Sequence, residues 1–189
     1  MTIAVIGTGF IGDTLGHAFA RAGHETIFGT RRPTGEPDTT TIADAIAKAD
    51  VVLLAVPAAA MAELLGTHGA ALAGKLVIDA ANNVGAPVAH HADLVARHAP
   101  GARYARAFNT LGGENFADPD FGGIPADLFY SAPAQDRATL DTLITAVGLR
   151  PVYVGADKQD IVDGVLRLWF ALAVGQGRGR HLAFHTLTR

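Results

Sequence analysis

The sequence predicts an α/β fold with a doubly wound, mainly parallel sheet and a short helical appendage at its carboxyl end. Three observations support this prediction. Short apolar runs alternate along the chain with longer segments whose apolar residues recur at helical spacing. The first run, residues 2–7, is almost continuously apolar, as expected of a strand that is buried on both faces. A glycine-rich turn connects this run to the first helical segment.

The predicted strands are short apolar or β-branched runs that are bounded by glycine, proline or polar residues. The shortest consists of three threonines at residues 39–41. We expect these strands to form most of one sheet. They span residues 2–7, 25–29, 39–41, 51–57, 75–80, 102–108, 127–132 and 151–155.

The predicted helices lie between these strands and carry apolar residues at helical spacing. The first ends at Gly23, a residue type that commonly terminates helices. The last is rich in apolar residues and runs into a glycine-rich segment. Its Leu166, Trp169 and Phe170 are either core residues or part of a dimer surface. The predicted helices span residues 11–23, 42–50, 58–72, 135–148 and most of 158–179.

Length and composition favour one principal domain. The chain has 189 residues, of which 49% are hydrophobic and 17% charged, and this balance is typical of a folded chain with a buried core. We expect a main domain at residues 1–156. Residues 157–189 are then a helical tail that packs on this domain or on a dimer partner.

The composition also excludes several classes of function. The chain has no cysteine, which rules out disulfides, zinc held by thiolates and cysteine-bound iron–sulfur clusters, and we expect no metal site. A net charge of -3 gives no reason to expect nucleic acid as a partner. No basic leader precedes the first strand and the apolar runs are too short to span a bilayer, so we expect a cytoplasmic protein without a membrane partner.

Gly7, Gly9 and Gly12 form a G-x-G-x-x-G motif between the first strand and the first helix. In this context Gly7 permits a tight turn, Gly9 lets the backbone approach a pyrophosphate, and Gly12 lets the helix pack closely on the strand. The phosphate would bind the free amides at the helix N-terminus, with Thr8 as an additional donor. The motif therefore predicts a Rossmann-type dinucleotide site, although a glycine-rich turn without a ligand remains the alternative.

The segment "FGTRRP", residues 28–33, spans the end of the second predicted strand, where an acidic residue would bind the ribose hydroxyls of NAD. Here the chain has Thr30, Arg31 and Arg32 instead. A guanidinium can bind a phosphate through two hydrogen bonds or stack on adenine, so these residues favour NADP over NAD. The alternative is a solvated basic turn.

Three further loops are expected at the carboxyl ends of the strands, where ligands of open α/β sheets bind. The loop at 55–59 contains Val56 and Pro57, and its backbone could line the ribose or nicotinamide. The loops at 79–85 and 107–116 offer neutral polar side chains, which could equally serve only to make turns. The candidates that we predict to bind cofactor in these two loops are Ala81, Asn82, Asn109 and Thr110.

The same loops contain no histidine, lysine or tyrosine that could transfer a proton, so we predict no catalytic acid or base. His90 and His91 follow one loop but are expected on a helix surface. Such a site suits a hydride acceptor that delocalises the charge it receives and needs no acid or base from the protein, such as a flavin-like ring. No large second domain follows the last strand, and an open crevice suits a flat, extended partner.

Taken with these motifs, the chain resembles the coenzyme F420-dependent NADP oxidoreductase family, whose relatives include the NADPH-binding domain of the Steap metalloreductases. The similarity extends over nearly the whole chain. The segments that carry it are "VIGTGFIG", "GHETIFGTRR", "ADVVLLAVP", "AFNTLGGENFADPDFGG", "ADLFYS" and "LWFALAVGQGRGRHLAFHTL".

The resemblance implies hydride exchange between NADP(H) and an 8-hydroxy-5-deazaflavin, coenzyme F420, and a homodimer joined partly through the tail. It implies that residues 8–11, with Thr8, Gly9, Phe10 and Ile11, meet the pyrophosphate, and that Thr30 and Arg31 bind the 2′-phosphate with support from Arg32. Val56, Pro57 and Asn82 would line the nicotinamide half, and the loop at 107–112 would lie under the deazaflavin. Two alternatives remain: NADPH-dependent reduction of a flavin, quinone or metal chelate, and a non-catalytic NADPH sensor.

Overall fold

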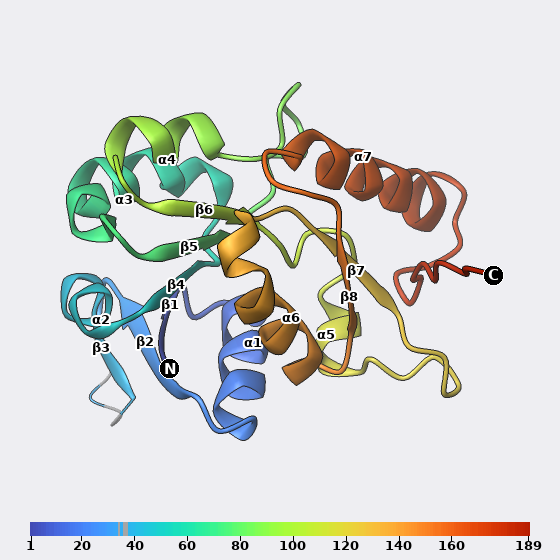
Figure 1. Ribbon diagram of the computed structural model, residues 1–189, viewed down its shortest axis with the longest axis horizontal. Coiled ribbons are helices and arrows are strands. Elements are labelled where there is room, and N and C mark those ends of the chain that lie inside the picture. Colours follow the sequence, from blue (N-terminus) through green and yellow to red (C-terminus); the bar gives the residue numbers. More distant parts are fainter. Residues whose placement is uncertain (34, 36–37) are drawn as a thin grey trace. The chain divides into compact units, whose positions relative to one another are not determined.

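A six-stranded sheet with the strand order β3-β2-β1-β4-β5-β6 forms the centre of the amino-terminal part of the chain (Figure 1). The structure is a computed structural model that describes residues 1–33, 35 and 38–189. All paired strands from β3 to β5 run parallel, which confirms the predicted α/β fold class. The strands are β1 Thr2–Ile6, β2 Glu25–Thr30, β3 Thr39–Thr41, β4 Val51–Leu54, β5 Leu76–Asp79 and β6 Arg103–Arg106.

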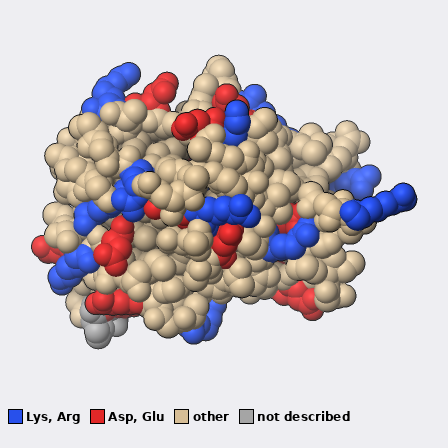
Figure 2. All heavy atoms as spheres, in the orientation of Figure 1, with Lys and Arg blue, Asp and Glu red and all other residues tan. Residues whose placement is uncertain are grey.

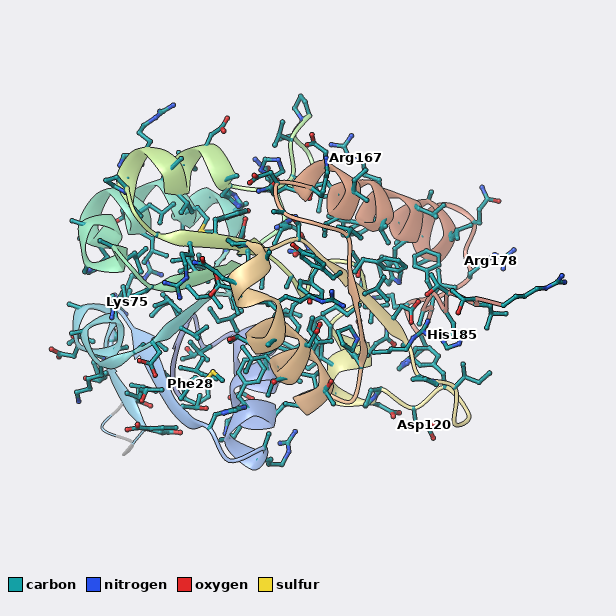
Figure 3. The ribbon with its side chains drawn as sticks, viewed as in Figure 1. Phe28, Lys75, Asp120, Arg167, Arg178 and His185 are labelled. Atoms are coloured by element: carbon teal, nitrogen blue, oxygen red, sulfur yellow. The ribbon has the colours of Figure 1, made fainter. Side chains whose placement is uncertain are left out.

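Helices cover both faces of this sheet. Alternate strand residues such as Ala4, Val52 and Val77 form a buried cluster with apolar residues of α2, α3 and α4. On the other face, α1 lies so close to β2 that a Cβ on Gly16 would collide with the Phe28 ring, which Figure 3 labels. The helices are α1 Phe10–Arg21, α2 Ile42–Lys48, α3 Met61–His68 and α4 Ala92–His98, and the 3-10 turns η1 Ala58–Ala60 and η2 Gly69–Leu72 adjoin α3.

The strand register aligns the carboxyl ends of four neighbouring strands. Ile6 of β1 pairs with Gly29 of β2 on one side and with Leu54 of β4 on the other. Leu54 in turn pairs with Asp79 of β5. The loops that follow these residues therefore begin side by side at one edge of the sheet, which is where open α/β sheets bind their ligands.

The chain divides into two compact units, Met1–Ala105 and Arg106–Arg189. This division lies well before residue 156, where the sequence places the end of the main domain. In the second unit, β7 Asp127–Tyr130 and β8 Arg150–Tyr153 pair in parallel as a separate two-stranded sheet. The helical elements of this unit are α5 Glu114–Ala117, η3 Ala134–Asp136, α6 Arg137–Ala146, α7 Gln159–Phe170 and the π-helical turn η4 Ala171–Gly175.

The expectation that the runs at 127–132 and 151–155 join the main sheet is therefore wrong. β7 and β8 pair with each other instead, from Asp127 opposite Arg150 to Tyr130 opposite Tyr153. The facing edges of these two strands are therefore already hydrogen-bonded. Ser131, the residue after β7, forms an isolated antiparallel bridge with Arg106. A short apolar run indicates that a strand will form, but it does not specify the strand with which it pairs.

The glycine-rich segment after α7 folds back on its own unit. The indole Nε1 of Trp169 donates to the carbonyl of Leu182 at 2.8 Å, and the amide of Asn115 donates to the carbonyl of Arg180 at 3.1 Å. Further along, His185, which Figure 3 labels, contacts the carbonyl of Pro125 at 2.8 Å. Leu166 and Trp169 are 2% and 1% exposed, so these two are core residues of the second unit.

An ion pair holds the same segment beside Trp169. Arg180 donates to Glu114 at 2.5 Å, and its guanidinium lies over the indole ring at 5.5 Å from the centroid. The hydrogen bond from Arg180 lowers the pKa of Glu114, so this carboxyl group remains ionised to more acidic pH than a solvated glutamate. Both partners are partly exposed, and we expect the pair to contribute less than about 1 kcal/mol.

Charges are distributed evenly over the surface in view. On the face that Figure 2 shows, lysine and arginine side chains are interspersed with aspartate and glutamate, and no single-sign patch covers it. Among the described residues, no helix combines the length and apolar character needed to cross a membrane.

Candidate functional site

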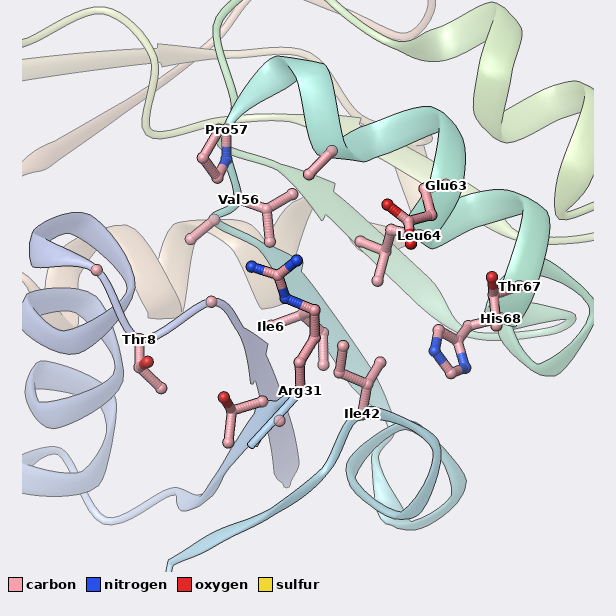
Figure 4. A pocket seen from close by; sticks show the side chains of 16 residues that line it. Ile6, Thr8, Arg31, Ile42, Val56, Pro57, Glu63, Leu64, Thr67 and His68 are labelled. Atoms are coloured by element: carbon pink, nitrogen blue, oxygen red, sulfur yellow. The ribbon is translucent and has the colours of Figure 1, made fainter. Parts of the chain in front are cut away.

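A cavity of about 350 Å³ opens at the carboxyl ends of β1, β2 and β4 in the first unit (Figure 4). Its walls come from the loop after β1, the end of β2, the loop after β4, the start of α2 and one side of η1 and α3. The lining residues are Ile6, 7–9, 29–31, Ile42, 55–57, Ala60, Glu63, Leu64, Thr67 and His68.

The three motif glycines meet different physical requirements. Gly7 has φ 109°, and a Cβ there would collide with the carbonyl of Ala55. A Cβ on Gly12 would collide with the carbonyl of Gly7. Gly9 differs, because a Cβ at this residue would have no atom within 4 Å. Internal packing thus explains Gly7 and Gly12, whereas Gly9 borders open space in the cavity.

The same loop ends at the N-terminus of α1. Gly9 is the N-cap residue, with φ -77° and ψ 176°, and has no side chain to cap the helix. The first backbone amides of α1, including those of Phe10 and Ile11, have no acceptor within the helix because no turn precedes them. A twelve-residue helix also carries partial positive charge at this end. The open space beside Gly9 therefore has the shape and polarity of a phosphate cradle, with Thr8 in the cavity wall.

The structure separates the three candidate residues at the carboxyl end of β2, Thr30, Arg31 and Arg32. Thr30 and Arg31 line the cavity, and Figure 4 shows the Arg31 side chain extending across it toward Val56. Arg32 is exposed and is not among the lining residues, but its backbone amide donates to the hydroxyl of Thr30 at 3.4 Å. Arg31 thus supplies a cation next to the cradle. Direct phosphate contact by Thr30, Arg31 and Arg32 remains a prediction.

The loop after β4 contributes Val56 and Pro57 to the cavity, as expected from its place in the sheet. The structure adds a set of residues that the sequence did not indicate. Ile42 comes from α2 and Ala60 from η1, while Glu63, Leu64, Thr67 and His68 come from α3. The i, i+4 spacing of 60, 64 and 68 and of 63 and 67 was the available signal, since it gives one helix face directly after a strand-end loop.

The loop after β5 contains Ala81, which is buried, and Asn82, which is partly buried. Neither is among the cavity-lining residues. The loop is fixed by the buried carboxyl group of Asp79. One of its oxygens accepts from the amide of Ala81 at 3.0 Å, and the other accepts from the amide of His91 at 2.9 Å and the Tyr104 hydroxyl at 2.7 Å.

The expectation of helix-surface positions for His90 and His91 is wrong. His91 is 5% exposed, precedes α4 as its N-cap residue, and has its Nδ1 at 3.2 Å from Asp79. His90 is partly buried and also lies before the helix. The reason is that the buried Asp79 at the end of β5 hydrogen-bonds to His91 and holds this part of the chain against the core. The sequence around the two histidines gives no indication of this long-range contact.

Asn109 and Thr110 belong to the second unit, where both are 0% exposed. The preceding residue, Phe108, has φ 66°, a left-handed conformation that is costly for an aromatic residue. Its ring packs edge-on against Phe116, with the centroids 6.0 Å apart. The loop at 107–112 is therefore a buried and constrained segment, and its role in binding remains a prediction.

Comparison with known proteins adds to this geometry. Residues 2–83 match the family described as NADP oxidoreductase, coenzyme F420-dependent. Over its full length the chain is 27% identical to a proposed F420-dependent NADP reductase from Arthrobacter sp. FB24, with a TM-score of 0.83 and complete coverage of both chains. The resemblance to this family is confirmed. The residues that match the family model include the glycine motif, the arginine pair and the cavity.

Two other solved structures show how widely the fold is shared. A hypothetical protein from Sinorhizobium meliloti is 26% identical, with a TM-score of 0.69, and the match covers 100% of this chain and 96% of that one. Pyrroline carboxylate reductase from Plasmodium falciparum, solved with NADP bound, has a TM-score of 0.64 at 12% identity, covering 94% and 69% of the two chains. The family match over residues 2–83 shows that this part of the chain is similar to NADP-dependent oxidoreductases, and the more distant structure supports the fold alone.

Proposed function

We propose that this protein binds NADP(H) in the strand-end cavity of its first unit and exchanges a hydride with the deazaflavin coenzyme F420. The proposal rests mainly on one observation: the open space beside Gly9 and the guanidinium of Arg31 belong to the same cavity. The family match and the Arthrobacter protein support the choice of both coenzymes.

In this proposal the cofactor phosphates occupy two separate places. The pyrophosphate lies against residues 7–9 and accepts hydrogen bonds from the first amides of α1, with the Thr8 hydroxyl as an additional donor. The 2′-phosphate lies at the end of β2, where Thr30 offers a hydroxyl and Arg31 a guanidinium. Val56 and Pro57 then line the side of the site that leads toward the nicotinamide.

The balanced reaction is NADPH + F420 + H⁺ → NADP⁺ + reduced F420, and it is reversible. The hydride is supplied by the nicotinamide C4 and accepted at C5 of the deazaflavin. The protein contributes by holding the two rings about 3–3.5 Å apart and by excluding water between them. In this proposal the proton that the reaction consumes comes from solvent, so no protein side chain needs to give or take a proton, and Glu63 and His68 of the cavity lining are not assigned that role.

A comparison of hydride acceptors tests the proposal. Purified protein is mixed with NADPH and with F420, FMN, a quinone or a ferric chelate, and the loss of nicotinamide absorbance is followed. We expect saturable oxidation with F420 and background rates with the other three. Faster oxidation with another acceptor would replace the deazaflavin by that substrate. Tight NADPH binding without acceptor-dependent oxidation would instead support a sensor.

We also propose that the protein is a homodimer. Helix α7 and the turn after it leave Ile161, Leu168 and Val174 exposed by 53%, 50% and 59%, and residues 161 and 168 share one face of the helix. Sedimentation velocity should give a mass near twice that of the 19.6 kDa chain. The double variant Ile161→Asp and Leu168→Asp should sediment as a monomer, whereas a wild-type monomer at micromolar concentration would contradict the proposal.

A further inference from the structure

Helix α3 presents three polar side chains to the cavity. Glu63, Thr67 and His68 all line it, and they lie within a turn and a half of one helix. Glu63 and Thr67 are exposed and His68 is partly buried, so all three can reach a bound molecule without opening the core. These groups lie on the helix side of the cavity, away from the glycine loop that faces the phosphate (Figure 4).

Beside these side chains the cavity is apolar. Ile6 is 0% exposed, and Ile42 and Leu64 are each 9% exposed. All three line the cavity. A flat aromatic ring placed here would contact the small exposed surfaces of Ile42 and Leu64, above a floor formed by the buried Ile6, and its polar edge would face Glu63, Thr67 and His68.

The order of binding groups indicates which part of the dinucleotide this ring is. Figure 4 shows Thr8 at one end of the cavity, Arg31 in the middle, and Thr67 with His68 at the other end. With the pyrophosphate at the glycine loop and the 2′-phosphate at Arg31, the next group along the molecule is the purine base. The apolar part of the cavity is therefore where the base would lie.

We infer that Glu63 determines base specificity, by accepting a hydrogen bond from the 6-amino group of adenine. This inference rests on the proposed function. A carboxylate only accepts hydrogen bonds, so it requires a donor on the purine edge. A 6-oxo purine such as hypoxanthine presents an acceptor oxygen at the same place and carries its donor on the neighbouring N1, so a carboxylate that is aimed at position 6 does not meet a donor there. Two acceptors then face each other, and the carboxylate loses a partner on binding.

A competing role for Glu63 is to act as a counter-charge to Arg31, since both side chains line one cavity. In that role Glu63 would alter the affinity for every 2′-phosphorylated dinucleotide by the same factor. It would not alter the ratio between two such dinucleotides that differ only at the 6-position of the purine. The ratio of two dissociation constants therefore separates the two roles.

The experiment measures binding of NADPH and of its 6-oxo analogue, reduced nicotinamide hypoxanthine dinucleotide phosphate, by calorimetry. Because Glu63 is solvent-accessible, we expect the wild type to favour NADPH by about tenfold, less than a fully buried hydrogen-bonding site would give. Glu63→Gln should bring the ratio to about one, since a carboxamide can donate to the 6-oxo group as well as accept from the 6-amino group. Glu63→Ala should also abolish the preference.

The matched control is Asp93→Asn, which removes one negative charge from an exposed residue in the first turn of α4, outside the lining residues. This variant should retain the wild-type ratio. A wild-type ratio of one, or a preference that both Glu63 variants retain, would overturn the inference while leaving NADPH binding intact. If the wild type binds neither dinucleotide, the proposed function itself fails, and the inference fails with it.

Discussion

Replacing Gly9 by valine should abolish binding of both NADPH and NADH while leaving the protein folded. No protein atom lies within 4 Å of a Cβ at this residue, so we expect the protein to accommodate the branched side chain. The backbone conformation, φ -77° and ψ 176°, is extended and is accessible to valine. The added methyl groups instead occupy the space in which the pyrophosphate would lie. Calorimetry with each dinucleotide measures the loss, and we expect the free energy of unfolding to change by no more than about 1 kcal/mol.

Gly7→Val and Gly12→Val are the contrasting variants. At both residues a Cβ would collide with a backbone carbonyl, and Gly7 in addition has a positive φ. These variants should therefore lose stability as well as binding, which thermal unfolding monitored by circular dichroism will detect. A folded Gly9→Val protein that binds NADPH with wild-type affinity would contradict the phosphate cradle.

Removing the guanidinium of Arg31 should weaken NADPH binding far more than NADH binding. Arg31 lines the cavity, and a hydrogen bond to a charged group contributes on the order of 1.5–3 kcal/mol. Arg31→Ala should therefore raise the dissociation constant for NADPH by about tenfold to a hundredfold. The constant for NADH, which lacks the 2′-phosphate, should change little. Fluorescence titration of the two reduced cofactors gives both constants.

Arg32→Ala serves as the control for Arg31→Ala. It removes the same charge from the adjacent residue, which does not line the cavity. Its effect on NADPH should be smaller, and salt should reduce it strongly because the side chain is exposed. Equal losses for NADPH and NADH in Arg31→Ala would show that this residue contacts a part of the cofactor that the two molecules share, such as the adenine ring.

The elements of the first unit follow closely from its sequence because their signals are local. The strands and the helices from α1 to α3 lie within a few residues of the expected ranges, since each is specified by its own apolar pattern and by a glycine, proline or polar boundary. The chain does not carry equally strong signals for α4 and α5. These helices have seven and four residues, too few for helical periodicity to be evident.

The site is predictable to the extent that topology determines it. Parallel strands bring the ends of β1, β2 and β4 to one edge, so Thr8, Arg31 and Pro57 could be placed together from the sequence. The contributions of Glu63 and His68 depend on how α3 is rotated about its axis, which is set by packing of Met61 and Leu65 into the core. Likewise, the burial of His91 results from Asp79, twelve residues earlier, and not from its own neighbours.

The Asp79 contacts have a consequence for where anions can bind along this edge of the sheet. The amides of Ala81 and His91, which an incoming phosphate would otherwise find after β5, already donate to the Asp79 side chain. The edge therefore has backbone amides available at β1, whereas at β5 the amides of Ala81 and His91 are already bonded to Asp79. In the proposed complex the cofactor phosphates would therefore bind near β1, and the uncharged part of the cofactor would lie nearer β5.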